Sequence, residues 1–515
     1  MDSGRGKAEV AHAEEGERSS RDDVDEALKE AQIGFEAIPR SDLKLDKRGL
    51  PLVPQPTDRK DDPLNWSAGL KLFVLLQVSL LAFLGPMAGA IVNPAFIPLS
   101  KQFNITVVQA SYELTVYIVF AGIGPLLTVP LSNLYGRRPV YIVGNLVAGI
   151  TNIAAGKCTT WTGILVTRVF NGIGAGSPAA IGAATICDMY FLHERGFYMG
   201  IFTFFLTNGP HAASLFGGFI AQRLGWRQCF LIPGYIQLGV LVFNLFCLPE
   251  TIFSRRSVAG LKERSFMDLL LFKNSGLQGR RLRAADFIKP FYMFKYLAIL
   301  IPGFWYMTAF GFGSVLFAAT GSKLFHGIYG FDVAQTGLML SIPLLIGCLL
   351  GEMCAGWLTD HMVYRYAKSH GGRREPEPRI NAIPLAILCP VGIIIDGVCL
   401  SHHKTVPWIG AAFGMGIANF GLQVATTITY SYCTDCYKPQ SSEISSILNL
   451  FRSIFSMTIS FYAIPLGEKI DYQYAWLIFA MINVVFLIPM VMLRFYGVGW
   501  RNSVWQKPPT FHDDL

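Results

Sequence analysis

Long apolar runs alternate with short polar segments along the chain from Leu70 onward. A helix needs about 20 residues to cross the roughly 30 Å hydrocarbon core of a bilayer, and each run is about that long. Because backbone N–H and C=O groups in lipid must be hydrogen-bonded within their own segment, each run predicts a membrane-spanning helix. The twelve predicted spans are 70–97, 108–132, 139–157, 161–189, 197–221, 229–248, 296–320, 334–358, 381–400, 406–432, 443–466 and 472–495.

Three polar loops indicate how these spans are oriented. The loop 249–295 holds ten Lys/Arg, the loop 360–379 holds five, and the loop after the second span holds Arg137 and Arg138. All three lie on the side that carries both termini, and basic residues gather in cytoplasmic loops. We therefore expect a cytoplasmic N-terminal tail 1–67, a six-helix half 68–248, a cytoplasmic central loop 249–295, a second half 296–496 and a cytoplasmic C-terminal tail 497–515.

Composition supports this organisation. Hydrophobic residues make up 52% of the chain and charged residues only 15%, whereas a soluble domain carries about 25% charged residues. Residues 1–62 hold 11 Lys/Arg and 16 Asp/Glu with almost no aromatic residues, so we expect the N-terminal tail to be disordered. The net charge of +8 comes from the membrane region. Since that charge follows loop orientation, we expect no nucleic-acid partner.

Signatures of enzymes and of metal sites are missing from the sequence. It contains no HExxH, no GxxxxGK[ST] and no Ser/His/Asp set on its loops. Most of the ten cysteines lie in apolar runs, and the Cys433-Thr-Asp-Cys436 spacing has no second pair beside it. We therefore expect neither an enzyme nor an ATP-driven pump, and no metal or cofactor.

The chain also contains an internal repeat. The segment Gly124–Asn133 ends the second span, and Gly351–Asp360 ends the eighth. Four aligned pairs share an offset of 227: Gly124/Gly351, Leu131/Leu358, Ser132/Thr359 and Asn133/Asp360. Two related six-helix halves are typical of secondary transporters.

Several motifs carry a family resemblance. They are Asp62-Pro-Leu-Asn-Trp-Ser67 before the first span, Pro130-Leu-Ser-Asn-Leu-Tyr-Gly-Arg-Arg-Pro139 after the second, Arg168-Val-Phe-Asn-Gly-Ile-Gly174 in the fourth and Asn208-Gly-Pro-His-Ala-Ala-Ser-Leu-Phe-Gly-Gly218 in the fifth. With these residues the chain resembles the major facilitator superfamily from Asp62 to Arg494, and within it the fungal twelve-span drug:proton antiporter branch.

The resemblance implies an all-α membrane protein with twelve transmembrane helices in two pseudo-symmetric six-helix halves, the major facilitator fold. It also implies a gating motif formed by Gly136, Arg137, Arg138 and Asp360. The family's acidic residue of the first-half motif is replaced by Asn133, which predicts a weaker or differently built gate between the halves. The fifth-span motif is also degraded, so the direction of transport stays open.

Ionisable residues inside the spans are the best functional signal, because such groups usually face a cavity or a partner. By resemblance, Arg168 lines the cavity of the first half, and the alternative is a structural arginine bonded to helix backbone. Glu113 is the candidate proton carrier, unless it lies in water at the outer interface. Glu352 is a further proton-coupling candidate, or else it pairs with the following loop.

Aromatic and amide side chains in the cavity-lining spans are the candidate substrate contacts, because aromatic faces near acids can hold organic cations. Each of them could instead pack in the core. One glycosylation sequon, Asn104-Ile-Thr106, falls on the outer side. The substrate candidates are Tyr117, Asn208, His211, Trp305, Tyr306, Asn419, Gln423 and Tyr430.

The function expected from these features is proton-coupled efflux of a small organic compound, such as a drug or fungal metabolite, by alternating access. The first alternative is proton-driven uptake of an organic cation such as a polyamine, and the second is a membrane sensor that does not transport. The expected partners are the small-molecule substrate, protons and the lipid bilayer, with the protein a monomer in the plasma membrane.

Overall fold

A computed structural model describes residues 44, 52, 54–253, 263–270, 283–369, 376–437 and 440–501. The described residues form helices and no β-strand. Most of the two predicted tails and parts of the central loop lie outside the described residues. The prediction of an all-helical membrane protein is confirmed.

The helices follow the order of the predicted spans. The first half contains η2 (Pro63–Asn65), α2 (Ala68–Ala90), η3 (Asn93–Ala95), α3 (Phe96–Phe103), α4 (Val107–Ala110), α5 (Tyr112–Tyr135), α6 (Arg137–Lys157), α7 (Trp161–Met189), α8 (Leu192–Leu224) and α9 (Gln228–Cys247). The central loop contains α10 (Phe266–Leu270), α11 (Ala284–Tyr292) and η4 (Met293–Lys295). The second half contains α12 (Leu297–Phe310), the π-helical turn η5 (Gly311–Val315), α13 (Leu316–Tyr329), α14 (Val333–Ser369), η6 (Glu377–Ala382), α15 (Ile383–Ala386), α16 (Leu388–Ser401), α17 (Trp408–Cys436), α18 (Ser441–Ile470) and α19 (Tyr472–Arg501).

Eleven helical segments of the described chain are long and apolar enough to cross a membrane. The remaining predicted span, 197–221, corresponds to α8, a helix of 33 residues. At about 1.5 Å per residue this helix is long enough to cross a bilayer. It falls short of the apolar character of the other eleven because its middle carries Thr203, Thr207, Asn208 and His211.

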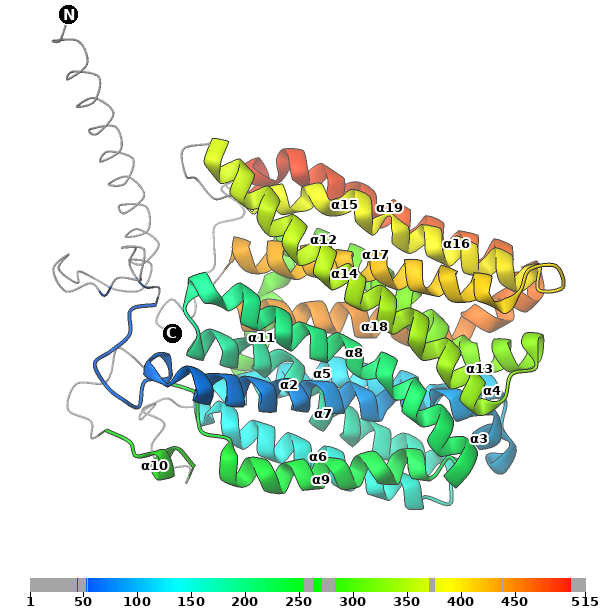
Figure 1. Cartoon of the computed structure of the whole chain (residues 1–515), viewed down its shortest axis with the longest axis horizontal. Helices are drawn as coiled ribbons and strands as arrows, with labels where there is room; N and C mark the ends of the chain where they lie inside the picture. The colour runs from blue at the N-terminus through cyan, green and yellow to red at the C-terminus, as the bar shows by residue number, and fades with distance from the viewer. Residues whose placement is uncertain are drawn as a thin grey trace, which may run out of the picture.

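The two halves lie side by side with their helices roughly parallel (Figure 1). Between the halves, α8 packs against α14 and α5 packs against α18. The segment before α2 and the last turn of α19 lie at one end of the bundle, which we call the terminal end; α3, α4 and α13 lie at the opposite end (Figure 1). Any group at mid-depth on α5, α8, α14 or α18 therefore lies close to the boundary between the halves.

Proline residues break fewer helices than their positions suggest. Asn93-Pro94 coincides with a break between α2 and α3, whereas α2, α5, α8 and α14 continue through Pro86, Pro125, Pro210 and Pro343. The backbone bond that a proline removes can be compensated by neighbouring helices in a bundle. The glycine beside one of these prolines permits close packing, because a Cβ on Gly85 would lie 2.5 Å from the Ala175 carbonyl oxygen.

The last part of the predicted N-terminal tail has a defined structure. Asp61 is buried and accepts hydrogen bonds from the Arg59 side chain, at 2.8 and 3.0 Å, and from Arg264 of the central loop, at 3.2 and 3.3 Å. Asp62 caps η2 by accepting from the Leu64 N–H. We call residues 54–67 together with Arg264 the clasp, because it joins the N-terminal segment to the central loop.

The charges around Asp61 determine whether this buried carboxyl of the clasp is protonated. Burial alone would raise the pKa of Asp61, but the hydrogen bonds from Arg59 and Arg264 outweigh it and hold that pKa below its ordinary value. The carboxylate is therefore charged at neutral pH, and the clasp is intact there.

Candidate functional site

A buried ion pair lies inside the first half. Arg168 Nε, on α7, is 3.3 Å from Glu113 Oε2, in the first turn of α5, and neither side chain is accessible to solvent. The two residues are 55 positions apart in the chain, and the packing of α5 on α7 brings them together. Glu113 is therefore not a carboxylate in water at the outer interface.

Amide groups complete the environment of the arginine. Arg168 donates to Asn152 Oδ1 at 3.0 Å, on α6, and to Asn171 Oδ1 at 3.2 Å, one turn further along α7. Its guanidinium carbon lies 4.5 Å from the centre of the Phe230 ring. Asn152 in turn donates to Gln237 on α9 at 2.8 Å. The positive charge is thus held by four helices of one half, and it keeps its amide partners if Glu113 is neutralised.

Tyr117 lies one turn after Glu113 on α5. It is buried, its ring packs against Gly89 of α2, and its hydroxyl has no hydrogen-bond partner among the described residues.

Two of the tyrosines predicted to contact substrate, Tyr306 and Tyr430, belong to an aromatic group that contacts Arg452 through Phe310. The Tyr306 and Tyr430 rings are 5.6 Å apart in an edge-to-face arrangement, and Phe310 is 6.1 Å from Tyr306. The Arg452 guanidinium carbon lies 4.6 Å from the centre of the Phe310 ring. We call these four residues the aromatic–arginine cluster. Arg452 was not among the predicted site residues, although it was one of the few charges inside a span.

Polar side chains at intervals of one turn join three helices at mid-depth. Thr203 and Thr207 lie on α8, and Cys348 and Glu352 lie on α14. Gln423, on α17, bonds to both Cys348 and Glu352. Gln423 and Thr427 donate to Glu352 Oε2, and Thr203 donates to Oε1 at 3.4 Å. Cys348 lies 3.4 Å from the Thr207 hydroxyl and 3.3 Å from Gln423 Oε1. One turn further, His211 Nε2 is 3.4 Å from Asn419 Nδ2.

We call these residues of α8, α14 and α17 the inter-half ladder. Their contacts decide against the alternative that Glu352 pairs with the loop after α14. Its carboxylate bonds to α17 of its own half and to α8 of the other half, rather than to the loop that follows α14. Three of the eight predicted substrate residues, His211, Asn419 and Gln423, belong to the ladder.

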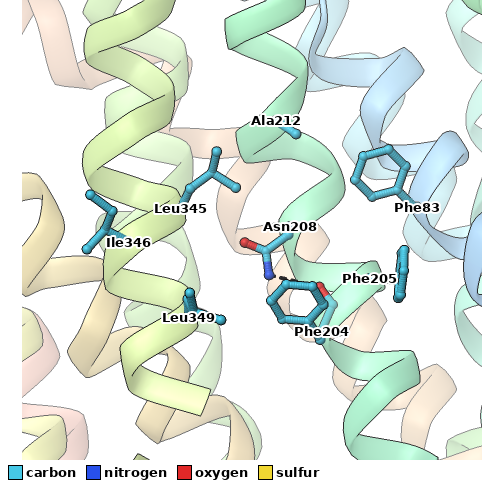
Figure 2. A pocket seen from close by; sticks show the side chains of 8 residues that line it. All are labelled: Phe83, Phe204, Phe205, Asn208, Ala212, Leu345, Ile346 and Leu349. Carbon is cyan, nitrogen blue, oxygen red and sulfur yellow. Dashed lines mark hydrogen bonds between the residues drawn. The ribbon is translucent and has the colours of Figure 1, made fainter. Parts of the chain in front are cut away.

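Asn208 lies beside the ladder, at an apolar pocket between α2, α8 and α14. The pocket measures about 300 Å³. Figure 2 shows Phe83, Phe204 and Phe205 on one side of it and Leu345, Ile346 and Leu349 on the other. Ile346 and Leu349 are 54% and 43% exposed on the outer surface of the bundle, so this pocket faces the lipid. Asn208 donates a hydrogen bond to the Phe204 carbonyl at 2.8 Å. It is the one polar residue among those that line the pocket.

The first-half gating motif binds an acid that the sequence did not suggest. Arg137 donates to Asn133 and to Ser132, and its Nε lies 3.3 Å from Asp188 Oδ2 at the end of α7. Asp188 thus supplies the charge that Asn133 lacks. The one feature of the sequence that could have pointed to Asp188 is its position as an acid at the end of the fourth span.

Glu250 anchors the same motif. It follows α9 and accepts from the backbone N–H groups of Arg137 at 2.9 Å and Arg138 at 3.0 Å, so it caps α6. Gly136 has a φ of +107°, and a Cβ there would lie 2.3 Å from Glu250 Oε2. Burial raises the pKa of Glu250, and its backbone hydrogen bonds oppose that rise.

The second half repeats this arrangement with more charge. Arg379, in η6, is 2.9 Å from Asp360 Oδ1 and 2.8 Å from Asp435 Oδ2. Asp360 ends the repeat segment that aligns with Asn133, and Asp435 lies at the end of α17 as Asp188 lies at the end of α7. Each half therefore has an arginine that bonds to the aligned position of the repeat, Asn133 or Asp360, and to an acid at the end of another helix, Asp188 or Asp435.

The remaining predicted residues lie apart from these sites. Trp305 is buried in the core of the second half. Asn104 is exposed at the opposite end, where it ends α3 with a φ of +52°. The described residues contain no group of three or more His, Cys, Asp or Glu that could hold a metal ion.

Comparison with known proteins identifies the family. Residues 78–459 match the model of the Major Facilitator Superfamily, which is more than half of the chain. This chain belongs to the Major Facilitator Superfamily. Its relatives in that superfamily are transporters, and the chain is a membrane transporter rather than an enzyme.

Fungal transporters are similar over most of the chain. The MFS-type transporter penM of Penicillium rubens is 25% identical, with 87% of this chain and 88% of that protein covered. The efflux pump radE of Floropilus chiversii is 27% identical, with 86% and 84% covered. A bacterial homologue of the human lysosomal transporter Spinster, in an inward-facing and unoccupied conformation, has the same fold, with a TM-score of 0.56 at 15% identity, covering 85% of this chain and 98% of that one.

Proposed function

We propose that this protein is a secondary transporter that exports a small organic compound in exchange for protons, by alternating access. The Glu113–Arg168 ion pair carries this proposal, because it is a fully buried pair of opposite charges that one proton can disrupt. Of the three proton-coupling candidates named from the sequence, Glu113 and Arg168 are assigned that role in this proposal, and Glu352 is assigned to the inter-half ladder.

Protonation of Glu113 would remove the attraction between the two side chains. Arg168 would then rely on Asn152, Asn171 and the Ala88 carbonyl, which keep it in place on the α6 and α2 side. The part of α5 that carries Glu113 packs against α18 of the other half, where Thr115 donates to Ser460. A proton can in this way bias the relative population of two conformations.

The inter-half ladder is the second part of the mechanism. Glu352 holds α8 through Thr203 and α17 through Gln423 and Thr427, so rocking of the halves must break the contact to Thr203. Further contacts close the opposite end: Thr115 donates to Ser460 at 2.8 Å, and Ser322 donates to the Pro94 carbonyl at 3.3 Å. We propose that this is the conformation open toward the terminal end.

Export rather than uptake is supported by the relatives, one of which is named an efflux pump. The test uses cells that lack or overexpress the protein, loaded with candidate compounds, with and without a proton uncoupler. Export predicts that overexpression lowers accumulation and that the uncoupler removes the difference. Accumulation that rises on overexpression would refute it, and binding of a compound without any flux in proteoliposomes would support the sensor alternative.

We also propose that the terminal end is cytoplasmic, that the protein is a plasma-membrane monomer, and that Asn104 is glycosylated. Asn104 is exposed at the end opposite the basic loops, which agrees with the positive-inside rule. Treatment with an N-glycosidase should increase the gel mobility of the wild-type protein and leave the N104Q variant unchanged. Equal mobility of treated and untreated wild type would argue against this orientation or this modification.

A further inference from the structure

Arg452 lies in the middle of α18, on the side of the helix away from lipid. Ile454 and Phe461, which are 51% and 50% exposed, mark the outer face of α18. At about 100° per residue they lie roughly 200° and 180° around the helix from Arg452. The arginine side chain is nevertheless partly accessible.

Aromatic side chains of the second half lie beside this arginine. Phe310 stacks on the guanidinium, and the Tyr306 ring lies next to both Phe310 and Tyr430. The neighbouring residue Ser453 packs against Gly122 of α5. Residues of α12, α17 and α18 thus meet at one point, next to the boundary between the halves.

No acid of the described chain neutralises Arg452. Glu352, at comparable depth, is engaged by the inter-half ladder, and Glu113, which lies nearer the opposite end, is engaged by Arg168. Within the part of the chain that the structure describes, Arg452 forms no ion pair, and its buried Nε has no hydrogen-bond partner. Charges inside membrane spans mark substrate pathways.

We propose that the aromatic–arginine cluster binds an aromatic organic acid through its carboxylate, so that the compound carried is an organic anion. A guanidinium binds a carboxylate through two parallel hydrogen bonds. The Phe310, Tyr306 and Tyr430 rings offer edges and faces against which an aromatic ring packs. This inference rests on the proposed transport function and narrows it to one class of substrate.

The charge at the cluster decides between classes of substrate. An organic cation such as a polyamine would meet the positive charge of Arg452 and two acids that already have partners. The aromatic groups that suggested cation binding in the sequence therefore surround a cation of the protein itself. The same rings serve an anionic ligand because their packing does not depend on the sign of its charge.

Binding of three matched probes to the full-length protein in detergent tests the proposal: 2-naphthoate, 2-naphthamide and 2-naphthylmethylammonium. We expect the carboxylate to bind wild type at least about tenfold more tightly than the amide, which corresponds to about 1.4 kcal/mol. R452Q should remove that preference without weakening the amide, and R452K should restore part of it. The matched control is R227Q, because Arg227 also stacks on an aromatic ring, that of Trp226 at 4.7 Å, at the opposite end.

Four outcomes would overturn the proposal: wild type binds the amide or the ammonium as tightly as the carboxylate, it binds none of the three, R452Q keeps the preference, or R227Q removes it. If R452Q does not fold, judged by thermal unfolding, R452K gives the answer, with a smaller loss expected. Proton-coupled flux is measured separately with E113Q. If carboxylate binding is intact but no proton-coupled flux is found, the proposed transport function is refuted and the anion site stands. If proton-coupled flux is found for neutral compounds alone, the anion site is refuted and the transport function stands.

Discussion

The two halves treat their buried arginines differently. In the first half Arg168 is fully buried and has an acid, two amides and an aromatic ring around it. In the second half Arg452 has an aromatic ring but no acid within the described residues. An internally neutralised charge can respond to a proton, whereas an arginine without an internal partner can bind an external anion. The comparison separates proton coupling from substrate recognition.

The largest expected effect comes from removing one partner of the neutralised site. R168A leaves Glu113 buried without a counter-charge, which should destabilise the protein by about 3–5 kcal/mol and reduce transport to background. The measurements are thermal unfolding and transport corrected for the amount of protein in the membrane. In the E113Q/R168Q double variant both charges are gone, so its loss of stability should be smaller than the sum of the two single losses. Full transport by R168A would remove the assignment.

A charge placed beside Arg452 should make the second half resemble the first. F310E offers the arginine an internal acid, which should weaken 2-naphthoate binding about tenfold, or about 1.4 kcal/mol. F310L removes the ring without adding a charge and is the control, with a smaller loss expected. Equal losses in the two variants would mean that packing rather than charge selects the ligand.

The inter-half ladder offers a third test, because one of its contacts between the halves, Glu352 to Thr203, depends on a carboxylate. E352Q replaces charged hydrogen bonds by neutral ones, which differ by about 1 kcal/mol. We expect a conformational equilibrium shifted about fivefold toward separation of α8 from α14. Spin labels at the exposed positions Tyr135 and Trp357 would report it as a change in distance distribution. T203V removes a single contact to the first half and should shift the distances in the same direction; unchanged distances in both variants would refute the role of the ladder.

The smallest expected effect concerns the clasp, which lies far from both arginines. Because the pKa of Asp61 is lowered in the folded protein, its stabilisation is present above the unfolded value of about 4 and is lost as the pH falls through the folded value. D61N should therefore speed proteolysis of the N-terminal segment at pH 7. In this variant the rate of that proteolysis should no longer rise as the pH falls. D58N is the control, since Asp58 lies on the surface and bonds to Lys44 alone at 2.6 Å. Identical cleavage of wild type and D61N would show that the clasp does not depend on this carboxylate.

The sequence by itself determined the helices and the short list of charges that matter. Backbone groups in lipid must be satisfied within a segment, so a run of about 20 apolar residues has one structural solution. For the same reason the few charges inside runs stood out, and Arg168, Glu113 and Glu352 were named. The sequence also predicted the repeat, whose aligned residues Asn133 and Asp360 each bond to an arginine.

Only the tertiary structure decided which of these groups are partners. Pairing depends on which helix faces meet, and residues more than about 50 positions apart carry no periodic signal of their contact. The structure therefore supplied the Glu113–Arg168 pair, the substitution of Asp188 for the acid missing at Asn133, and the bond between Asp61 and Arg264. It also left Arg452 without an acid, and a missing partner is visible only when every neighbouring helix is in place.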